Sequence, residues 1–133
     1  MRVLVSGATG FIGTALVPAL IGEGHDVVAG TRHPDRYRVE GGGGGGGRVT
    51  AVRFDVGDPS SLDAALEGAD AAYYLVHGMA GSGDFVARDR RAAEAFAAAA
   101  SRRGVRVVYL GGLGDREVSA GRSAHLRSRH EVG

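Results

Sequence analysis

The chain of 133 residues contains no cysteine, and it also contains no lysine, asparagine or glutamine. The absence of cysteine excludes a disulfide framework, a thiolate metal site and a cysteine nucleophile. The absence of lysine means that no lysine can act as a base or as a Schiff-base former. All sixteen basic residues are therefore arginines, and they leave a net charge of only +1. This balance argues against a dedicated nucleic-acid partner.

Long apolar runs are also missing. No stretch approaches the length of a transmembrane span, and glycines interrupt the apolar N-terminus before it could resemble a secretion signal. We therefore expect no membrane partner and a cytoplasmic location. The five histidines show no metal-ligand spacing, so no metal site is predicted. The length fits one domain with a real core and is too short for two.

Residues 3–13 read Val-Leu-Val-Ser-Gly-Ala-Thr-Gly-Phe-Ile-Gly and are the most informative part of the chain. An apolar strand runs into three glycines at three-residue spacing, and a helical pattern begins at once. In such a motif the first glycine allows the tight turn at the end of the strand. The second lets the backbone approach a pyrophosphate closely, and the third lets the helix pack closely on the sheet. The alternative is a glycine-rich turn without a ligand. The predicted cofactor contacts in this turn are Gly7, Thr9, Gly10, Phe11, Ile12 and Gly13.

Strand and helix patterns alternate along the chain. The predicted strands are residues 2–6, 26–31, 50–55, 71–76 and 105–110, and the predicted helices are 11–21, 58–67, 84–103 and one beginning near Ser123. Alternation at this spacing predicts an α/β fold, a doubly wound parallel sheet ordered 3-2-1-4-5. In the first helix we expect one apolar face to be buried, formed by Ile12, Ala15, Leu16, Ala19 and Leu20.

The residue types after the second strand bear on which dinucleotide is preferred. An acidic residue is expected there if the ribose 2′-hydroxyl of NAD is bound, but the chain has Gly-Thr-Arg-His at 30–33. The guanidinium of Arg32 suits a 2′-phosphate, with Arg36 as an additional cation. We therefore predict that NADP(H) is preferred over NAD(H). The alternative makes Arg32 an ordinary exposed loop residue.

The ends of two further strands supply the remaining candidates. Asp55 is expected to accept a hydrogen bond from the adenine amino group while Val56 packs on the ring, although Asp55 could instead only begin a turn. Val76 and His77 lie near the expected ribose–nicotinamide end. His77 would hydrogen-bond the cofactor or substrate there, or be a simple loop histidine.

Five blocks of sequence carry a resemblance that spans nearly the whole chain. They are Ser-Gly-Ala-Thr-Gly-Phe-Ile-Gly at 6–13, Tyr-Leu-Val-His at 74–77, Arg-Asp-Arg-Arg-Ala-Ala at 88–93, Tyr-Leu-Gly-Gly-Leu-Gly at 109–114 and His-Leu-Arg-Ser-Arg-His-Glu-Val-Gly at 125–133. The chain resembles the extended and atypical short-chain dehydrogenase/reductases, and within them the NmrA-like NAD(P)-binding proteins. The resemblance implies a Rossmann-type dinucleotide-binding domain and an oxidoreductase activity.

The chain departs from this superfamily where its catalytic groups are expected. A serine or threonine usually follows the fifth strand, and a Tyr-x-x-x-Lys pair lies on the next helix. Here residues 111–114 are Gly-Gly-Leu-Gly, and the four-residue spacing holds His125 and Arg129. Those two would share a helix face, with His125 as a proton donor, or they are surface residues. Three hypotheses therefore stay open: an NADP(H)-dependent oxidoreductase, a non-catalytic NADP(H)-sensing module, and an isomerase or epimerase that retains its nicotinamide.

Similar proteins continue beyond the point that corresponds to Gly133, so we expect a domain over residues 1–133 that is truncated before its sixth strand. The predicted strand 105–110 would then be an open hydrophobic edge, through which we expect self-association. The seven consecutive glycines at 41–47 are predicted to form a mobile loop.

Overall fold

The computed structural model describes residues 1–39, 46–76 and 84–111. In chain order its elements are β1 (Arg2–Ser6), α1 (Phe11–Gly22), β2 (Asp26–Thr31), the 3-10 helix η1 (Pro34–Arg36), β3 (Val49–Arg53), α2 (Pro59–Leu66), β4 (Ala71–Tyr74), α3 (Phe85–Arg102) and β5 (Arg106–Tyr109). The helix expected near Ser123 lies outside the described residues.

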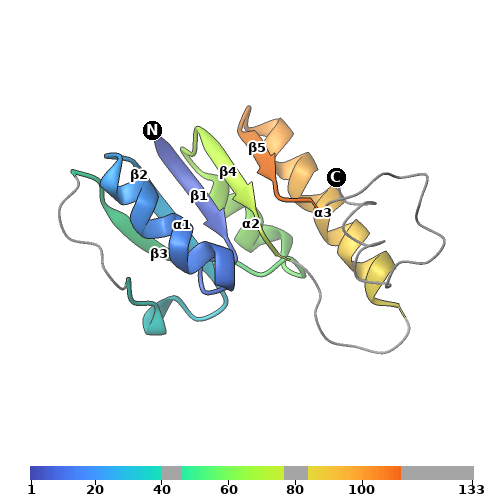
Figure 1. Ribbon diagram of the computed structural model, residues 1–133. Helices are drawn as coiled ribbons and strands as arrows, with labels where there is room; N and C mark the ends of the chain where they lie inside the picture. The colour runs from blue at the N-terminus through green and yellow to red at the C-terminus, as the bar shows by residue number, and fades with distance from the viewer. Residues whose placement is uncertain (40–45, 77–83, 112–133) are drawn as a thin grey trace.

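The five strands form one parallel sheet in the order β3-β2-β1-β4-β5 (Figure 1). This order confirms the predicted doubly wound α/β fold. Strands β3 and β4 end two residues earlier than predicted, at Arg53 and Tyr74. The backbone leaves β3 because a turn begins at Asp55, whose carbonyl accepts a hydrogen bond from Asp58 N.

Helices cover both faces of the sheet, with α1 on one face and α2 and α3 on the other (Figure 1). Successive strand residues point to opposite faces, so Leu4 packs on the α2–α3 side and Val5 on the α1 side. Phe96 of α3 is the largest fully buried side chain and contacts Phe54 and Tyr74 through its ring. The continuous apolar strands are therefore explained by burial on two sides.

The buried face of α1 differs from the predicted one. Its buried residues are Gly13, Val17 and Ile21, whereas Ile12, Ala15 and Ala19 are exposed and Leu16 and Leu20 are half-buried. The helix is apolar on nearly all sides, so its pattern does not select a face. The rotation is set by Gly13, where a Cβ would lie 2.7 Å from Ala8 Cα. A helix held at Gly13 must also turn Val17 and Ile21 inward, because they follow at four-residue spacing.

The described α-helices begin and end within one residue of their predicted bounds. Asp58 caps α2 by accepting a hydrogen bond from Ser60 N, and Pro59 occupies the first turn. Asp84 precedes α3 without a side-chain cap, and Gly104 follows it with a φ of +66°. Within the three described ranges, no helix is long and apolar enough to cross a membrane.

Candidate functional site

The carboxyl ends of the inner strands lie side by side and form the candidate site. Ser6, the last residue of β1, is in register with Gly30 of β2 and with Tyr74 of β4. Thr31, the last residue of β2, is in register with Arg53 of β3. The order of the strands reverses at β1, because β2 lies on one side of it and β4 on the other. Ligands of open α/β sheets bind at such a point.

A tight turn connects β1 to α1 at this edge. Gly7 has a φ of +73°, in the region that favours glycine. The turn is closed by Gly10 N, which donates a hydrogen bond to Gly7 O at 2.9 Å. It is tied to the neighbouring strand by Ala8 N, which donates to Gly30 O at 3.3 Å. The turn therefore has the conformation that the glycine spacing predicts.

The first turn of α1 presents backbone donors to the same edge. Gly10 is the N-cap residue and supplies no side-chain hydrogen bond to the helix. The N–H groups of Phe11, Ile12 and Gly13 have no intrahelical acceptor, because the first N–H groups of any helix lack one. These donors and the positive end of the helix dipole suit an anion such as a pyrophosphate. The site thus fits the phosphates of a dinucleotide.

The two side chains at the start of α1 are exposed to solvent. Phe11 is 93% exposed and Ile12 is 42% exposed. A surface pocket of about 680 Å³ lies beside them and is lined by Phe11, Ile12, Thr14, Ala15 and Leu16. The predicted contacts at Phe11 and Ile12 are therefore available through their backbone N–H groups.

Sequence reasoning missed the role of Ser6. Its side chain is fully buried, and its hydroxyl donates to Tyr73 O at 2.9 Å and accepts from Leu75 N at 3.2 Å. The hydroxyl thereby connects the end of β1 to Tyr73 within β4 and to Leu75, the residue that follows β4. The signal in the sequence is a single hydroxyl at the end of an apolar run. Ser6 thus adds a side-chain link between two strands that meet at the crevice.

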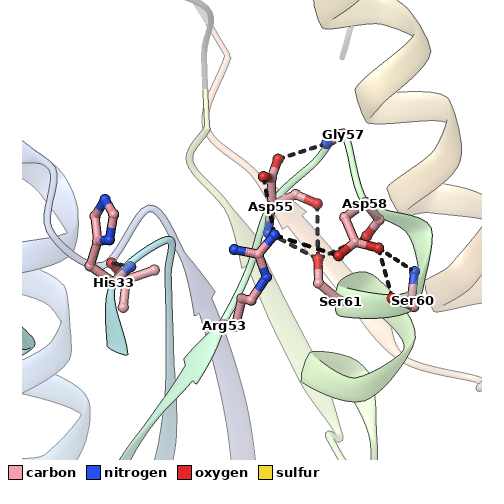
Figure 2. Close-up of polar contacts among 8 residues, drawn as sticks. His33, Arg53, Asp55, Gly57, Asp58, Ser60 and Ser61 are labelled. Atoms are coloured by element: carbon pink, nitrogen blue, oxygen red, sulfur yellow. Dashed lines mark hydrogen bonds and ion pairs between the residues drawn. The ribbon is translucent and has the colours of Figure 1, made fainter. Parts of the chain in front are cut away.

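Arg32 and His33 lie just beyond β2. Both are exposed, and His33 N donates to Thr31 Oγ1 at 3.3 Å (Figure 2). Arg32 takes part in no ion pair among the described residues. In contrast, Arg38 of the same loop donates to the carbonyl oxygens of Asp35 and Tyr37. The guanidinium of Arg32 is thus available to a ligand at the end of β2.

Asp55 begins a turn at the end of β3. Its Oδ1 accepts a hydrogen bond from Gly57 N at 3.0 Å (Figure 2). The turn is supported by Ser61, whose nearly buried hydroxyl accepts from Asp55 N at 3.0 Å and lies within hydrogen-bond distance of Asp55 O. Sequence reasoning did not identify Ser61. Asp55 therefore begins a turn, as the alternative interpretation expected. Its contact with the adenine stays a prediction.

A second carboxylate lies next to this turn. Asp58 Oδ1 accepts hydrogen bonds from Ser60 N at 3.1 Å and from Ser60 Oγ at 2.7 Å. The hydrogen bond from the Ser60 side chain is the main reason that the pKa of Asp58 lies below its usual value. Arg53 lies between the two carboxylates, 3.7 Å from Asp55 Oδ2 and 3.6 Å from Asp58 Oδ2. The turn after β3 thus brings two carboxylates to the arginine at the end of that strand.

The remaining predicted site residues divide into two groups. Val56 and Val76 are half-buried and pack against the core on the α2–α3 side. His77, His125 and Arg129 lie outside the described residues, as do residues 41–45 of the glycine run. The structure therefore brings together the turn at Gly7–Gly13, Arg32, Asp55, Val56 and Val76 at the carboxyl ends of the strands.

Comparison with known proteins connects this arrangement to dinucleotide binding. Residues 7–130 match the sequence profile of the NAD(P)H-binding family. A 2-alkyl-3-oxoalkanoate reductase from Stenotrophomonas maltophilia is 36% identical over 75 residues, which are 56% of this chain and 21% of the reductase. The chain thus spans about a fifth of the length of that relative.

Solved structures share the fold. The oxidoreductase ylbE from Lactococcus lactis superposes with a TM-score of 0.73 at 22% identity, covering 99% of this chain and 57% of that one. A short-chain dehydrogenase/reductase superfamily protein from Agrobacterium tumefaciens, solved with bound NAD, superposes with a TM-score of 0.77 at 22% identity. The superposition covers 99% of this chain and 43% of that protein. At these identities the similarity shows the fold.

Proposed function

The chain belongs to the NAD(P)H-binding family, and we propose that it forms the NADP(H)-binding part of an oxidoreductase of the short-chain dehydrogenase/reductase type. The observation that carries this proposal is the turn at Gly7–Gly13, which directs the unpaired N–H groups of the first turn of α1 toward the carboxyl ends of the strands. Those donors match the charge and geometry of a pyrophosphate. Within the family, the proposed subgroup is NmrA-like.

Each part of the dinucleotide has a proposed partner in the chain. The N–H groups of Phe11, Ile12 and Gly13 bind the pyrophosphate, and the exposed Thr9 joins them from the glycine turn. Arg32 binds the 2′-phosphate, since it is exposed at the end of β2 and no acidic residue takes its place. At the adenine, Asp55 accepts the amino group and Val56 packs on the ring. Val76 and His77 lie toward the ribose–nicotinamide end.

The bound nicotinamide supplies hydride transfer, while the protein residues bind and orient it. The proposed proton donor is His125, because it has the spacing of the usual catalytic tyrosine. A second candidate function is a non-catalytic NADP(H)-sensing module. It is favoured by the Gly-Gly-Leu-Gly sequence at 111–114, which places no hydroxyl where the superfamily has a catalytic one.

Calorimetric titration with NADPH and with NADH tests the cofactor proposal. We expect NADPH to bind more tightly, and we expect Arg32→Ala to weaken NADPH binding about 10- to 100-fold, the worth of a charged hydrogen bond, while NADH binding stays the same. The matched control is Arg38→Ala, which removes the same charge from the same loop. Because Arg38 bonds its own backbone, we expect little change. Failure of both dinucleotides to bind the folded chain contradicts the proposal.

The variant His125→Ala separates the two candidate functions. Loss of turnover with unchanged NADPH affinity supports the oxidoreductase and identifies the proton donor. Turnover is measured as the oxidation of NADPH in the presence of ketones and aldehydes. If NADPH binds but is not oxidised in the presence of any ketone or aldehyde tested, the result favours the sensing module.

A further inference from the structure

Arg53 lies next to the position where the 2′-phosphate is proposed to bind. It is the last residue of β3 and is in register with Thr31, the residue before Arg32. Neighbouring strands are about 4.8 Å apart. The distance over which salt screens charges is about 8 Å at physiological ionic strength. The backbone of Arg53 is therefore closer than one screening length to the end of β2. Charge changes at Arg53 therefore reach this part of the site.

The guanidinium of Arg53 holds two fixed carboxylates at once. Asp55 and Asp58 each have Oδ1 occupied by a backbone N–H group, from Gly57 and Ser60. Their Oδ2 atoms both face Arg53, at 3.7 Å and 3.6 Å (Figure 2). Because these backbone hydrogen bonds do not involve Arg53, we expect both carboxylates to keep their positions when Arg53 is replaced. Arg53 thus lowers the local charge from −2 to −1.

We propose that Arg53 is a specificity-determining residue for NADP(H): by offsetting part of the negative charge of Asp55 and Asp58, it reduces the repulsion that a 2′-phosphate would otherwise meet beside Arg32. This inference rests on the proposed NADP(H) binding. NADH carries no 2′-phosphate, so its affinity does not depend on this repulsion. The ratio of the NADH to the NADPH dissociation constant therefore reports the effect of Arg53 separately from any change in the shared adenosine contacts.

The expected effect is moderate, because the group is partly exposed to solvent. The side chain of Arg53 is 57% exposed and those of the two carboxylates are 37% exposed. For a doubly charged phosphate about 8 Å away in a mostly aqueous surrounding, removing one positive charge changes the ratio about twofold when salt screens the charges and about sixfold when it does not. The size of this change must fall as the salt concentration rises, since the interaction is screened.

Four variants test the inference by calorimetry with NADPH and NADH. Arg53→Met keeps much of the side-chain volume and removes the charge, whereas Arg53→Lys keeps the charge. Asp58→Asn keeps a residue that can cap α2 and removes one negative charge. The matched control is Arg48→Met, because Arg48 pairs with Asp26 at 3.1 Å just before the other end of β3. The five residues of β3 separate the two arginines by about 17 Å, or about two screening lengths.

We expect the ratio to fall about twofold to sixfold in Arg53→Met, to stay near the original value in Arg53→Lys and Arg48→Met, and to rise in Asp58→Asn. We also expect the change in Arg53→Met to shrink in 0.5 M salt, about a threefold rise over physiological ionic strength. An unchanged ratio in Arg53→Met, or an equal change in Arg48→Met, overturns the inference while leaving NADP(H) binding intact. If Arg53→Met does not fold, an unchanged or lower ratio in Asp58→Asn overturns it instead. Absence of dinucleotide binding to the unaltered chain defeats the proposed function itself.

Discussion

Replacing Gly13 with alanine tests how closely α1 must approach the turn for the site to form. A Cβ at this position would lie 2.7 Å from Ala8 Cα and 2.8 Å from Ala8 C, and it would also collide with Gly7 O. All three are backbone atoms, so none can rotate away. The helix must therefore move outward or tilt, and its first-turn N–H groups move with it.

The size of the effect follows from two opposing contributions. Overpacking a dense site costs about 1 to 3 kcal/mol, and the backbone contacts place Gly13→Ala near the upper end of that range. The higher helix propensity of alanine returns about 1 kcal/mol. The expected loss in the free energy of unfolding is therefore about 2 kcal/mol. For a domain of this size it corresponds to a melting temperature lower by about 8 °C.

The matched control is Gly22→Ala in the same helix, because a Cβ at Gly22 meets no atom within 4 Å. We expect this variant to be more stable by about 0.5 to 1 kcal/mol, with unchanged NADPH affinity. Gly13→Ala should lower NADPH affinity at least tenfold, since displaced N–H groups lose charge-assisted hydrogen bonds. Urea denaturation and calorimetric titration measure both effects. If the two variants have equal stability and equal affinity, the close contact at Gly13 does not shape the site.

Three further predictions concern other parts of the chain. Ser6→Ala leaves Leu75 N–H without its acceptor and should lower the free energy of unfolding by about 1 to 3 kcal/mol; equal urea midpoints for Ser6→Ala and the unaltered chain would contradict this. Hydrogen bonding to Ser60 lowers the folded-state pKa of Asp58, so its contribution to stability is present above the unfolded pKa of about 3.9 and is lost as the pH falls through the folded pKa. The urea midpoint should therefore drop less steeply below about pH 4 in Asp58→Asn, and identical acid profiles would refute the role of Asp58. At the edge of the described sheet, Val107 and Val108 of β5 are each 39% exposed, so we expect concentration-dependent self-association in sedimentation that Val108→Glu weakens; a monomer at every concentration would exclude it.

The sequence predicted the sheet order and the glycine turn because both depend on strong local signals. Apolar runs alternate with helical patterns, and right-handed crossovers then leave few possible topologies. It did not predict which face of α1 is buried, since apolar residues surround that helix. The contact that decides the rotation is the approach of Gly13 to Ala8. Glycine spacing therefore carried more information about the helix than its hydrophobic pattern.

The roles of Ser6 and Ser61 could not be predicted for a different reason. The partners of Ser6 are backbone groups at Tyr73 and Leu75, 67 and 69 residues away in the sequence. No local pattern indicates a hydrogen bond to a distant backbone group. Ser61 acts within a short turn, but its bond to Asp55 N depends on how far β3 extends. The cofactor contacts of Arg32, Asp55, Val56 and Val76 remain predictions, since they depend on a ligand.

The position of β1 in the sheet has a consequence for synthesis of the protein. β1 is made before the other four strands of the described sheet, but it lies in the middle of that sheet, and one of its two neighbours is β4. Ser6 meets Leu75 only after 69 further residues have been added, which takes about 3 to 14 s at typical translation rates of about 5 to 20 residues per second. During this interval the apolar strand has an open side. The nascent chain is therefore most prone to aggregate before β4 emerges. Stalling the ribosome before it reaches Ala71 should increase the amount of aggregated chain.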